Sequence, residues 1–311
     1  MDWTLAGKDL KEATFEAMEV GERLGPIEVV VDDHYVKQFA FAVDDYAPIS
    51  NGEASSAHAA ILVPELLRLL NVNYDPNTEV GLHQREEVWI QSLPRVGERV
   101  TLVGEFVDKF VKREKGYVVT DASAHSAEDG RLLVRHRSTE VAKVDEDVVM
   151  ASGSAAKPSR SVNGEYPTDR PPAKSYEPEL PPGTPFLGPT KYLHQDQISV
   201  FSNVGYFWRT IHTDLDAAAK AGSNRTIAQG LMEAMYISEL GSAIFGSAWA
   251  RSGWMSLVFL APVYPNDTVV AKAVLLSPDA REDPERVELE SWVENQDGTK
   301  VAVGWIGATV P

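Results

Sequence analysis

The sequence repeats itself, and this repeat limits the fold more than any other feature, because two similar halves should adopt similar structures. Gly97-Glu-Arg-Val100 and Asn266-Asp-Thr-Val269 each follow a proline and precede an alternating strand pattern. Asp129-Gly130 and Asp297-Gly298 are turn dipeptides of the kind that join paired strands. Members of both pairs lie about 168 residues apart, which indicates duplication of one unit. A third pair of similar segments is 43–50 and 205–212.

Each half is expected to hold one long helix and an antiparallel sheet. The segment 230–245 is apolar on more than one side of a helix, so other elements should surround it. Long alternating segments follow closely, and an antiparallel sheet curling around the helix is the economical arrangement. The predicted strands of this half are 254–259, 268–276, 286–295 and 300–310. The N-terminal half repeats the order with a helix at 59–70, which Pro64 must start or kink, and with strands at 86–91, 99–110, 116–126 and 131–144. The predicted fold class is therefore α+β.

A stretch rich in proline and serine separates the halves. Between about residues 148 and 185 the chain has hardly any periodic apolar residues, which is typical of a linker. We therefore expect an N-terminal domain at 1–147, a linker at 148–185 and a C-terminal domain at 186–311. The sequence leaves open whether the doubled chain forms a homodimer.

Composition excludes several classes of protein. Of the 311 residues, 43% are hydrophobic and 24% are charged, which indicates a globular rather than a disordered or fibrous chain. The sequence has no cysteine and no secretory signal at its N-terminus, so a cytoplasmic location is expected. The sequence has no run of about 18 apolar residues, so we expect no membrane span. The net charge of −17, without a local Lys/Arg cluster, disfavours nucleic acid as a partner. The spacing of the histidines predicts no metal site. The sequence also lacks a glycine-rich phosphate-binding loop, so no cofactor is expected.

Residues suited to chemistry gather around His212. This histidine lies in a loop shortly before the apolar helix that Gly230 opens. A histidine can act as a general base near neutral pH because its ordinary pKa is about 6.5. The backbone N–H of Gly230 would lie at the positive end of the helix dipole, where it could stabilise a developing oxyanion.

The predicted architecture resembles the double hotdog fold of the MaoC-like hydratases and dehydratases, in which a sheet wraps a long helix twice in one chain. The resemblance covers nearly the whole chain outside the linker. The family motif runs approximately Gly-Asp-x-Asn-Pro-Ile/Leu-His-x-Asp, then a spaced Ala and Gly, then Ile-x-His-Gly-Met. The matching residues are Ile211, His212, Asp214, Ala218, Gly222, Ile227 and Gly230.

The sequence also departs from this motif. Phe207 stands at the position of the family's catalytic aspartate, Arg209 at that of its asparagine, and Gln229 at that of the histidine before the helix glycine. The N-terminal copy keeps an aspartate, Asp45, but has Ser50 at the histidine position. Half of the family's acid/base pair is therefore missing from each copy.

Several site residues have a second, structural interpretation. His212 could be a loop or core histidine held by a structural hydrogen bond, and Gly230 could be an ordinary glycine at a helix start. Asp214 could orient His212 or partly replace the missing acid, or it could cap the helix at 215–221. Arg209 could bind a substrate carboxylate or a CoA phosphate, or it could be a solvated surface residue. The aromatic run 206–208 could line an acyl pocket or belong to the core.

The resemblance implies a hydro-lyase that acts on an enoyl or 3-hydroxyacyl thioester, with acyl-CoA as the expected partner. Under this hypothesis His212 is the base, assisted by Asp214. The Gly230 N–H stabilises the oxyanion, and Gln229, Arg209 and Phe207 surround the substrate. Hotdog folds also resemble thioesterases, for which Glu233 or Glu239 would be the carboxylate to suspect. A non-catalytic acyl-CoA or metabolite binder descended from a hydratase is the third alternative.

Overall fold

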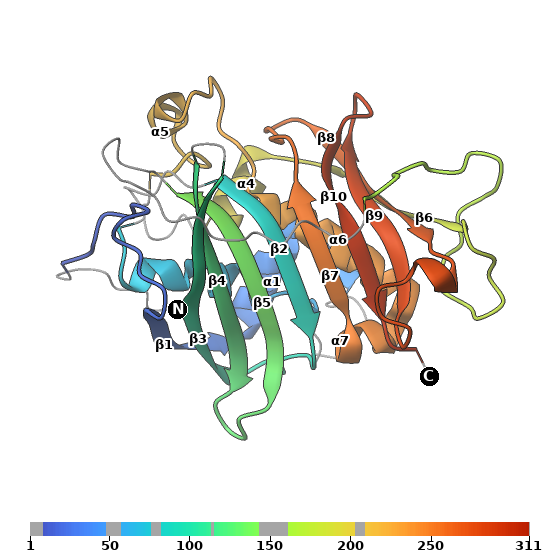
Figure 1. Ribbon diagram of the computed structural model, residues 1–311, viewed down its shortest axis with the longest axis horizontal. Helices are drawn as coiled ribbons and strands as arrows, with labels where there is room; N and C mark the ends of the chain where they lie inside the picture. Colours follow the sequence, from blue (N-terminus) through green and yellow to red (C-terminus); the bar gives the residue numbers. More distant parts are fainter. Residues whose placement is uncertain are drawn as a thin grey trace.

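The computed structural model describes residues 9–47, 57–75, 82–112, 115–142, 161–202 and 209–310. Its strands form one ten-stranded antiparallel sheet in the order β1-β3-β4-β5-β2-β7-β10-β9-β8-β6. Figure 1 shows this sheet as one curved layer, with α1 and α6 behind it. The long apolar helix therefore lies against a sheet, as the sequence predicted.

Five strands come from the N-terminal half. They are β1 (Arg23–Val31), β2 (Leu82–Ile90), β3 (Glu98–Lys112), β4 (Lys115–Ser126) and β5 (Leu132–Ala142). The helices described in this half are α1 (Asp33–Val43), α3 (Val63–Leu67) and the 3-10 helix η1 (Arg68–Val72). Helix α1 starts where the Asp32 carboxylate accepts a hydrogen bond from the Tyr35 N–H, and it ends at Asp44, whose φ is 53°.

The other five strands come from the C-terminal half. They are β6 (Pro185–Tyr192), β7 (Trp254–Phe259), β8 (Thr268–Leu275), β9 (Val287–Asn295) and β10 (Lys300–Ala308). The helices described here are α4 (Gln195–Phe201), α5 (Leu215–Lys220), α6 (Gly230–Phe245), α7 (Trp249–Ser252) and the 3-10 helices η3 (Gly246–Ala248) and η4 (Pro278–Ala280). The strand order is that of the N-terminal half when β6 to β10 replace β1 to β5.

The repeat seen in the sequence is thus present in the topology. Gly97 and Asn266 both have positive φ, 90° and 72°, and they lie just before the equivalent strands β3 and β8. Gly130 and Gly298 also match, with φ of 73° and 74° in the β4–β5 and β9–β10 turns. Left-handed backbone explains why glycine or asparagine stands at these places.

Strands β2 and β7 join the two halves. They pair antiparallel from Arg85 opposite Val258 to Trp89 opposite Trp254. The outer strands of the sheet are β1 and β6, and each pairing has a register shift beside a proline, Pro26 in β1 and Pro189 in β6. Two half-sheets are therefore continuous at the centre and irregular at both edges.

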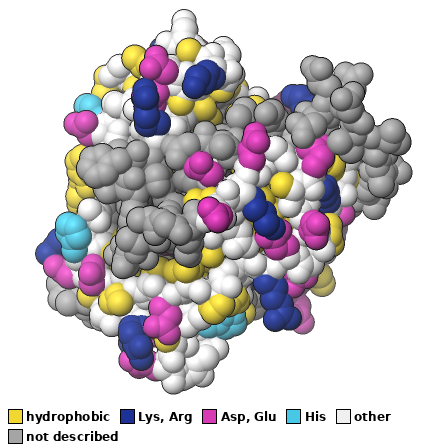
Figure 2. Space-filling view, turned by 90° about the vertical axis from the view of Figure 1, so that its left-hand side faces the viewer, with side chains coloured by type: hydrophobic (Ala, Val, Ile, Leu, Met, Phe, Trp, Pro, Cys, Tyr) yellow, Lys and Arg dark blue, Asp and Glu magenta, His cyan; other side chains and the backbone are white. Residues whose placement is uncertain are grey.

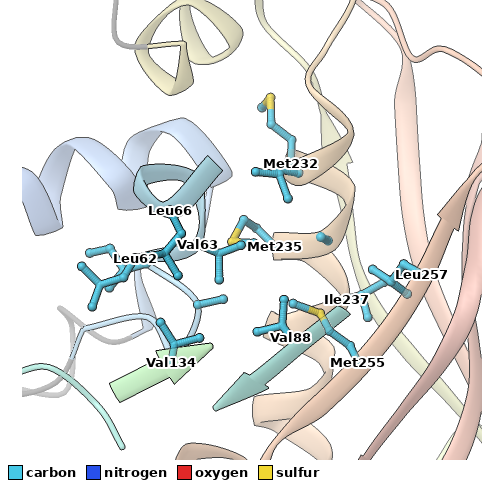
Figure 3. Packing of buried hydrophobic residues seen from close by; sticks show 14 of the residues in the cluster. Leu62, Val63, Leu66, Val88, Val134, Met232, Met235, Ile237, Met255 and Leu257 are labelled. Atoms are coloured by element: carbon cyan, nitrogen blue, oxygen red, sulfur yellow. The ribbon is translucent and has the colours of Figure 1, made fainter. Parts of the chain in front are cut away.

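One hydrophobic core extends across both halves. Figure 3 shows Val63 and Leu66 of α3 opposite Met232 and Met235 of α6, with β2 and β7 beneath them. Met232 and Met235 are fully buried, which explains why α6 is apolar on more than one side.

Two predictions about helices needed correction. The helix predicted at 59–70 is an α-helix only at Val63–Leu67, followed by a 3-10 turn to Val72. Pro64 lies in its first turn, where a missing N–H is tolerated, and the helix therefore begins at Val63, one residue before this proline. Helices α1 and α4 were not predicted, because the segments after the first strands were interpreted as loops.

The described part of the predicted linker packs against the C-terminal half. Residues 161–184 contain no named helix or strand, but the backbone N–H groups of Asn163 and Gly164 donate to the Glu290 carboxylate. The Tyr176 N–H donates to the Ile244 carbonyl at the end of α6. The boundary at 147/148 lies outside the described residues, and the domain limits stay predictions.

Two predictions from the sequence concern the surface and the helices, namely that nucleic acid is a poor partner and that no segment spans a membrane. On the face shown in Figure 2, Lys and Arg side chains are interspersed with Asp and Glu rather than gathered in a patch. Within the described ranges, no helix is both long and apolar enough to cross a membrane.

Candidate functional site

A cavity of about 880 Å³ lies between the two halves. The N-terminal half contributes residues of α3, η1, β2, β4 and β5, and the C-terminal half contributes the loop around His212 and the first turns of α6. Apolar residues from both halves line it, including Pro64, Leu67, Phe201, Ile211, Leu231 and Phe259. The size and the mostly apolar lining suit an organic ligand with a long or bulky apolar part.

His212 is fixed in the wall of this cavity. Its Nδ1 lies 2.7 Å from the Ile227 carbonyl oxygen, which can only accept, so Nδ1 carries the proton. The Ile227 N–H in turn donates to the Ile211 carbonyl, and Gln195 Nε2 donates to the His212 carbonyl at 3.0 Å. Nε2 is therefore the ring nitrogen with a lone pair.

Burial sets the charge of this histidine. His212 is only partly exposed, and this partial burial lowers the pKa of the imidazole to about 4, although the Ile227 carbonyl acts in the opposite direction. The ring is consequently neutral at physiological pH and can accept a proton on Nε2.

The first turn of α6 forms the neighbouring wall. Gln229 is the N-cap residue, its Nε2 donates to Ser202 Oγ, and its Oε1 is buried without a hydrogen-bond partner among the described residues. A Cβ at Gly230 would lie 3.0–3.2 Å from atoms of the Phe259 ring. A larger residue here would therefore require the Phe259 ring to shift by a few tenths of an ångström. Gly230 also opens a helix of 16 residues with its N–H groups near the cavity.

Glu233 also lines the cavity, one helical turn after Gly230. It is only 2% exposed, and its Oε2 is buried without a hydrogen-bond partner in the described part of the chain. Burial raises the pKa of this carboxyl well above its ordinary value. The sequence had singled out Glu233 only for the thioesterase alternative, although a glutamate in so apolar a helix was a usable signal.

The opposite wall contains a histidine that the sequence did not single out. His83 on β2 lines the cavity, its ring meets Phe259 edge to face with centroids 4.9 Å apart, and its Nε2 lies 3.0 Å from Glu86 Oε2. Glu86 is fully buried and also accepts from His136 Nδ1 at 2.8 Å. Burial raises the pKa of Glu86, but the contacts with His136 and then His83 outweigh it and lower the pKa overall. A histidine in an alternating strand gives no sequence signal of such a contact.

Asp214 and Arg209 lie beside the cavity and contact each other. The Asp214 carboxylate caps α5 by accepting from the Ala217 N–H at 2.9 Å, and it forms an ion pair with Arg209 at 2.7 Å. Arg209 also contacts Asp216, and its side chain is 66% exposed. Neither residue is among those lining the cavity. Phe207, like Tyr206 and Trp208, lies outside the described residues.

A second group of buried charges lies outside the cavity, where α1, β6 and α6 meet. Lys191 Nζ is 2.8 Å from Glu239 Oε2 and 2.6 Å from the Asp44 carbonyl oxygen. Burial raises the pKa of Glu239 to about 7, with Lys191 opposing and Asp45 and Asp44 adding to the shift. Asp45 also lies 3.8 Å from His58, and this group links the two halves.

The match to known families falls on the half that contains His212. Residues 177–295 match the family model described as MaoC like domain. The C-terminal half is a MaoC-like domain. Within the described ranges, no group of three or more acidic or histidine side chains could hold a metal ion.

Solved structures extend the likeness to the whole chain. A protein described as a MaoC-like dehydratase shares 13% identity at a TM-score of 0.66, over 96% of this chain and 100% of its own. A MaoC-like dehydratase from Phytophthora capsici shares 14% identity at a TM-score of 0.64, over 94% and 96%. A Mycobacterium tuberculosis protein described as a double hotdog shares 11% identity at a TM-score of 0.64, over 96% and 98%. No curated protein sequence matches the chain. The MaoC-like domain is therefore the second half of a double hotdog fold.

Proposed function

We propose that the protein is a hydro-lyase that hydrates an enoyl thioester, or dehydrates a 3-hydroxyacyl thioester, with CoA as the expected carrier. The observation that supports this most is the neutral His212, held by Ile227 in the wall of a large apolar cavity beside the first turn of α6. In hydration, Nε2 of His212 takes a proton from water as the water oxygen adds to the β-carbon.

The thioester oxygen needs stabilisation while negative charge develops on it. The Gly230 N–H, at the positive end of a helix of 16 residues, is suited to this role. Lys115 also lines the cavity and supplies positive charge, in a chain of net charge −17, for the anionic part of the ligand. Arg68 lines the cavity too, but Glu65 pairs with its guanidinium. The apolar lining suits the acyl chain.

The state of Glu233 favours a hydro-lyase over a thioesterase. A carboxylate that attacks a thioester, or activates water for that attack, must be ionised, whereas burial keeps Glu233 neutral. Release of free thiol from acyl-CoA, followed with a thiol reagent, separates the two reactions.

The test is replacement of the base. His212→Ala should lower kcat/KM for hydration of enoyl-CoA by at least about a hundredfold, the lower scale of general base catalysis. His34→Ala, an exposed histidine on α1, is the matched control and should leave the rate unchanged. A His212→Ala protein that retains the wild-type rate would exclude the proposal. If wild type and His212→Ala bind enoyl-CoA equally well and neither turns it over, the protein is a binding protein rather than an enzyme.

A further inference from the structure

We propose that Glu233 is the acid that protonates the α-carbon of the substrate, as the partner of the base His212. This inference rests on the proposed hydro-lyase function and deepens it. It supplies an acid in place of the family's aspartate, whose position Phe207 occupies, and in place of Asp214, which caps α5 outside the cavity.

The position of Glu233 supports the role. Ile227, which holds His212, precedes Gly230 by three residues, and Glu233 follows Gly230 by three. Residues three apart lie on the same face of a helix, and Gly230 and Glu233 both line the cavity from this face of α6. The residue that holds the base, the oxyanion donor and the acid thus lie within the seven residues 227–233.

The surroundings of Glu233 differ from those of an ordinary buried carboxylate. Its Oε2 is buried without a hydrogen-bond partner among described residues, whereas Glu239 on the same helix contacts Lys191. Leaving a buried polar atom unpaired is costly, and natural proteins keep such groups mainly where they serve a function.

The charge state is consistent with an acid. Burial raises the pKa of Glu233, and Tyr236, the next titratable group on its helix, offers no positive charge. The other titratable or charged side chains lining the cavity are Arg68, His83, Lys115, Glu140, His212 and Tyr264, and no ion pair joins any of them to Glu233 within the described ranges. Glu233 therefore holds its proton while His212 lacks one, the division of roles that acid/base catalysis requires.

The reaction balances with these two residues. An O–H bond of water breaks and its proton moves to Nε2 of His212, while the oxygen forms a bond to the β-carbon. The π electrons of the double bond move toward the α-carbon and the thioester oxygen. The Glu233 O–H bond then breaks and its proton forms a C–H bond at the α-carbon. Transfer of the proton from the imidazolium to the Glu233 carboxylate, through water, restores both groups.

The experiment compares Glu233→Gln with Glu239→Gln in the full-length protein. The amide keeps the shape and hydrogen-bonding capacity of Glu233 but cannot donate a proton to carbon, so kcat for enoyl-CoA hydration should fall at least about a hundredfold. The wild-type rate should decline as the pH rises through the pKa of Glu233, and the residual rate of Glu233→Gln should lack this decline. Glu239→Gln removes a carboxyl from the same helix outside the cavity and should retain the wild-type rate.

A second measurement does not depend on turnover. The infrared difference spectrum between wild type and Glu233→Gln at neutral pH should contain the band of a protonated carboxyl, and its absence would overturn the inference. A Glu233→Gln protein as active as wild type, beside an inactive His212→Ala, would also overturn it while leaving the hydro-lyase function intact. A wild-type protein that hydrates no enoyl-CoA would instead refute the proposed function.

Discussion

Glu239 should make the protein less stable as the pH rises, and the size of the effect follows from the structure. Burial raises its pKa from 4.5 to about 7, so between these values the folded protein binds a proton that the unfolded chain releases. The stability associated with the protonated group is complete below pH 4.5 and is lost as the pH rises through about 7. At about 1.4 kcal/mol per pH unit, this interval corresponds to about 3 kcal/mol.

Glu239→Gln should remove this dependence. Urea denaturation of both proteins at pH 5 and pH 8 gives the free energies of unfolding, and the difference between variant and wild type should shift by about 3 kcal/mol in favour of the variant at pH 8. Glu28→Gln, at a carboxylate that is 59% exposed, controls for the loss of one charge.

Other groups in this cluster titrate, but they are common to both proteins. Burial lowers the pKa of His58, so its contribution to stability is lost as the pH falls, opposite in sign to that of Glu239. Lys191, Asp44, Asp45 and Tyr236 complete the charged surroundings. If the difference between Glu239→Gln and wild type is the same at both pH values to within about 1 kcal/mol, the assignment of a raised pKa to Glu239 is wrong.

Two further substitutions test packing around the cavity. Gly230→Ala should cost about 1–3 kcal/mol of unfolding free energy, because its Cβ would lie 3.0–3.2 Å from the Phe259 ring, and an unchanged urea midpoint would show that this ring moves aside freely. Glu86→Gln should cost about 1–3 kcal/mol at pH 7, because an amide lacks the negative charge whose contacts with His136 and His83 lower the pKa of the buried carboxyl. The wild-type pKa of Glu86 is lowered, so its stabilising effect disappears as the pH falls through that value; a cost that persists undiminished at low pH would contradict this account.

The strands could be predicted from the sequence because local signals determine them. Alternating residues and the turns at Gly130 and Gly298 gave β7 with its observed bounds and β8, β9 and β10 to within two residues. The sheet order could not be derived in this way. Pairing of β2 with β7 depends on contacts between residues about 170 positions apart, and no single segment encodes them.

For a related reason, the sequence predicted the site residues of the C-terminal half but not those of the N-terminal half. His212 and Gly230 stand in a motif of fixed spacing, and the structure places both in the wall of the cavity. His83 and Glu86 lie in the other half of the chain and reach this region only through the β2–β7 pairing. Asp214 was ambiguous because a carboxylate before a helix can cap it or serve chemistry, and the hydrogen bond to Ala217 shows that it caps α5.

The central pairing of β2 with β7 restricts how the two halves could exist apart. Separation would leave each half with an unpaired edge strand, β2 or β7, and in β7 the apolar Met255 and Leu257 would lie at this edge beside free backbone groups. Such an edge is a template for aggregation or for pairing with a second copy. The present outer strands, by contrast, are each interrupted at a proline, Pro26 or Pro189, which has no N–H to offer a further strand. Duplication in one chain thus places β7, a strand prone to self-association, in the interior of the sheet. The strands left at the edges, β1 and β6, are the ones least able to pair with a further strand.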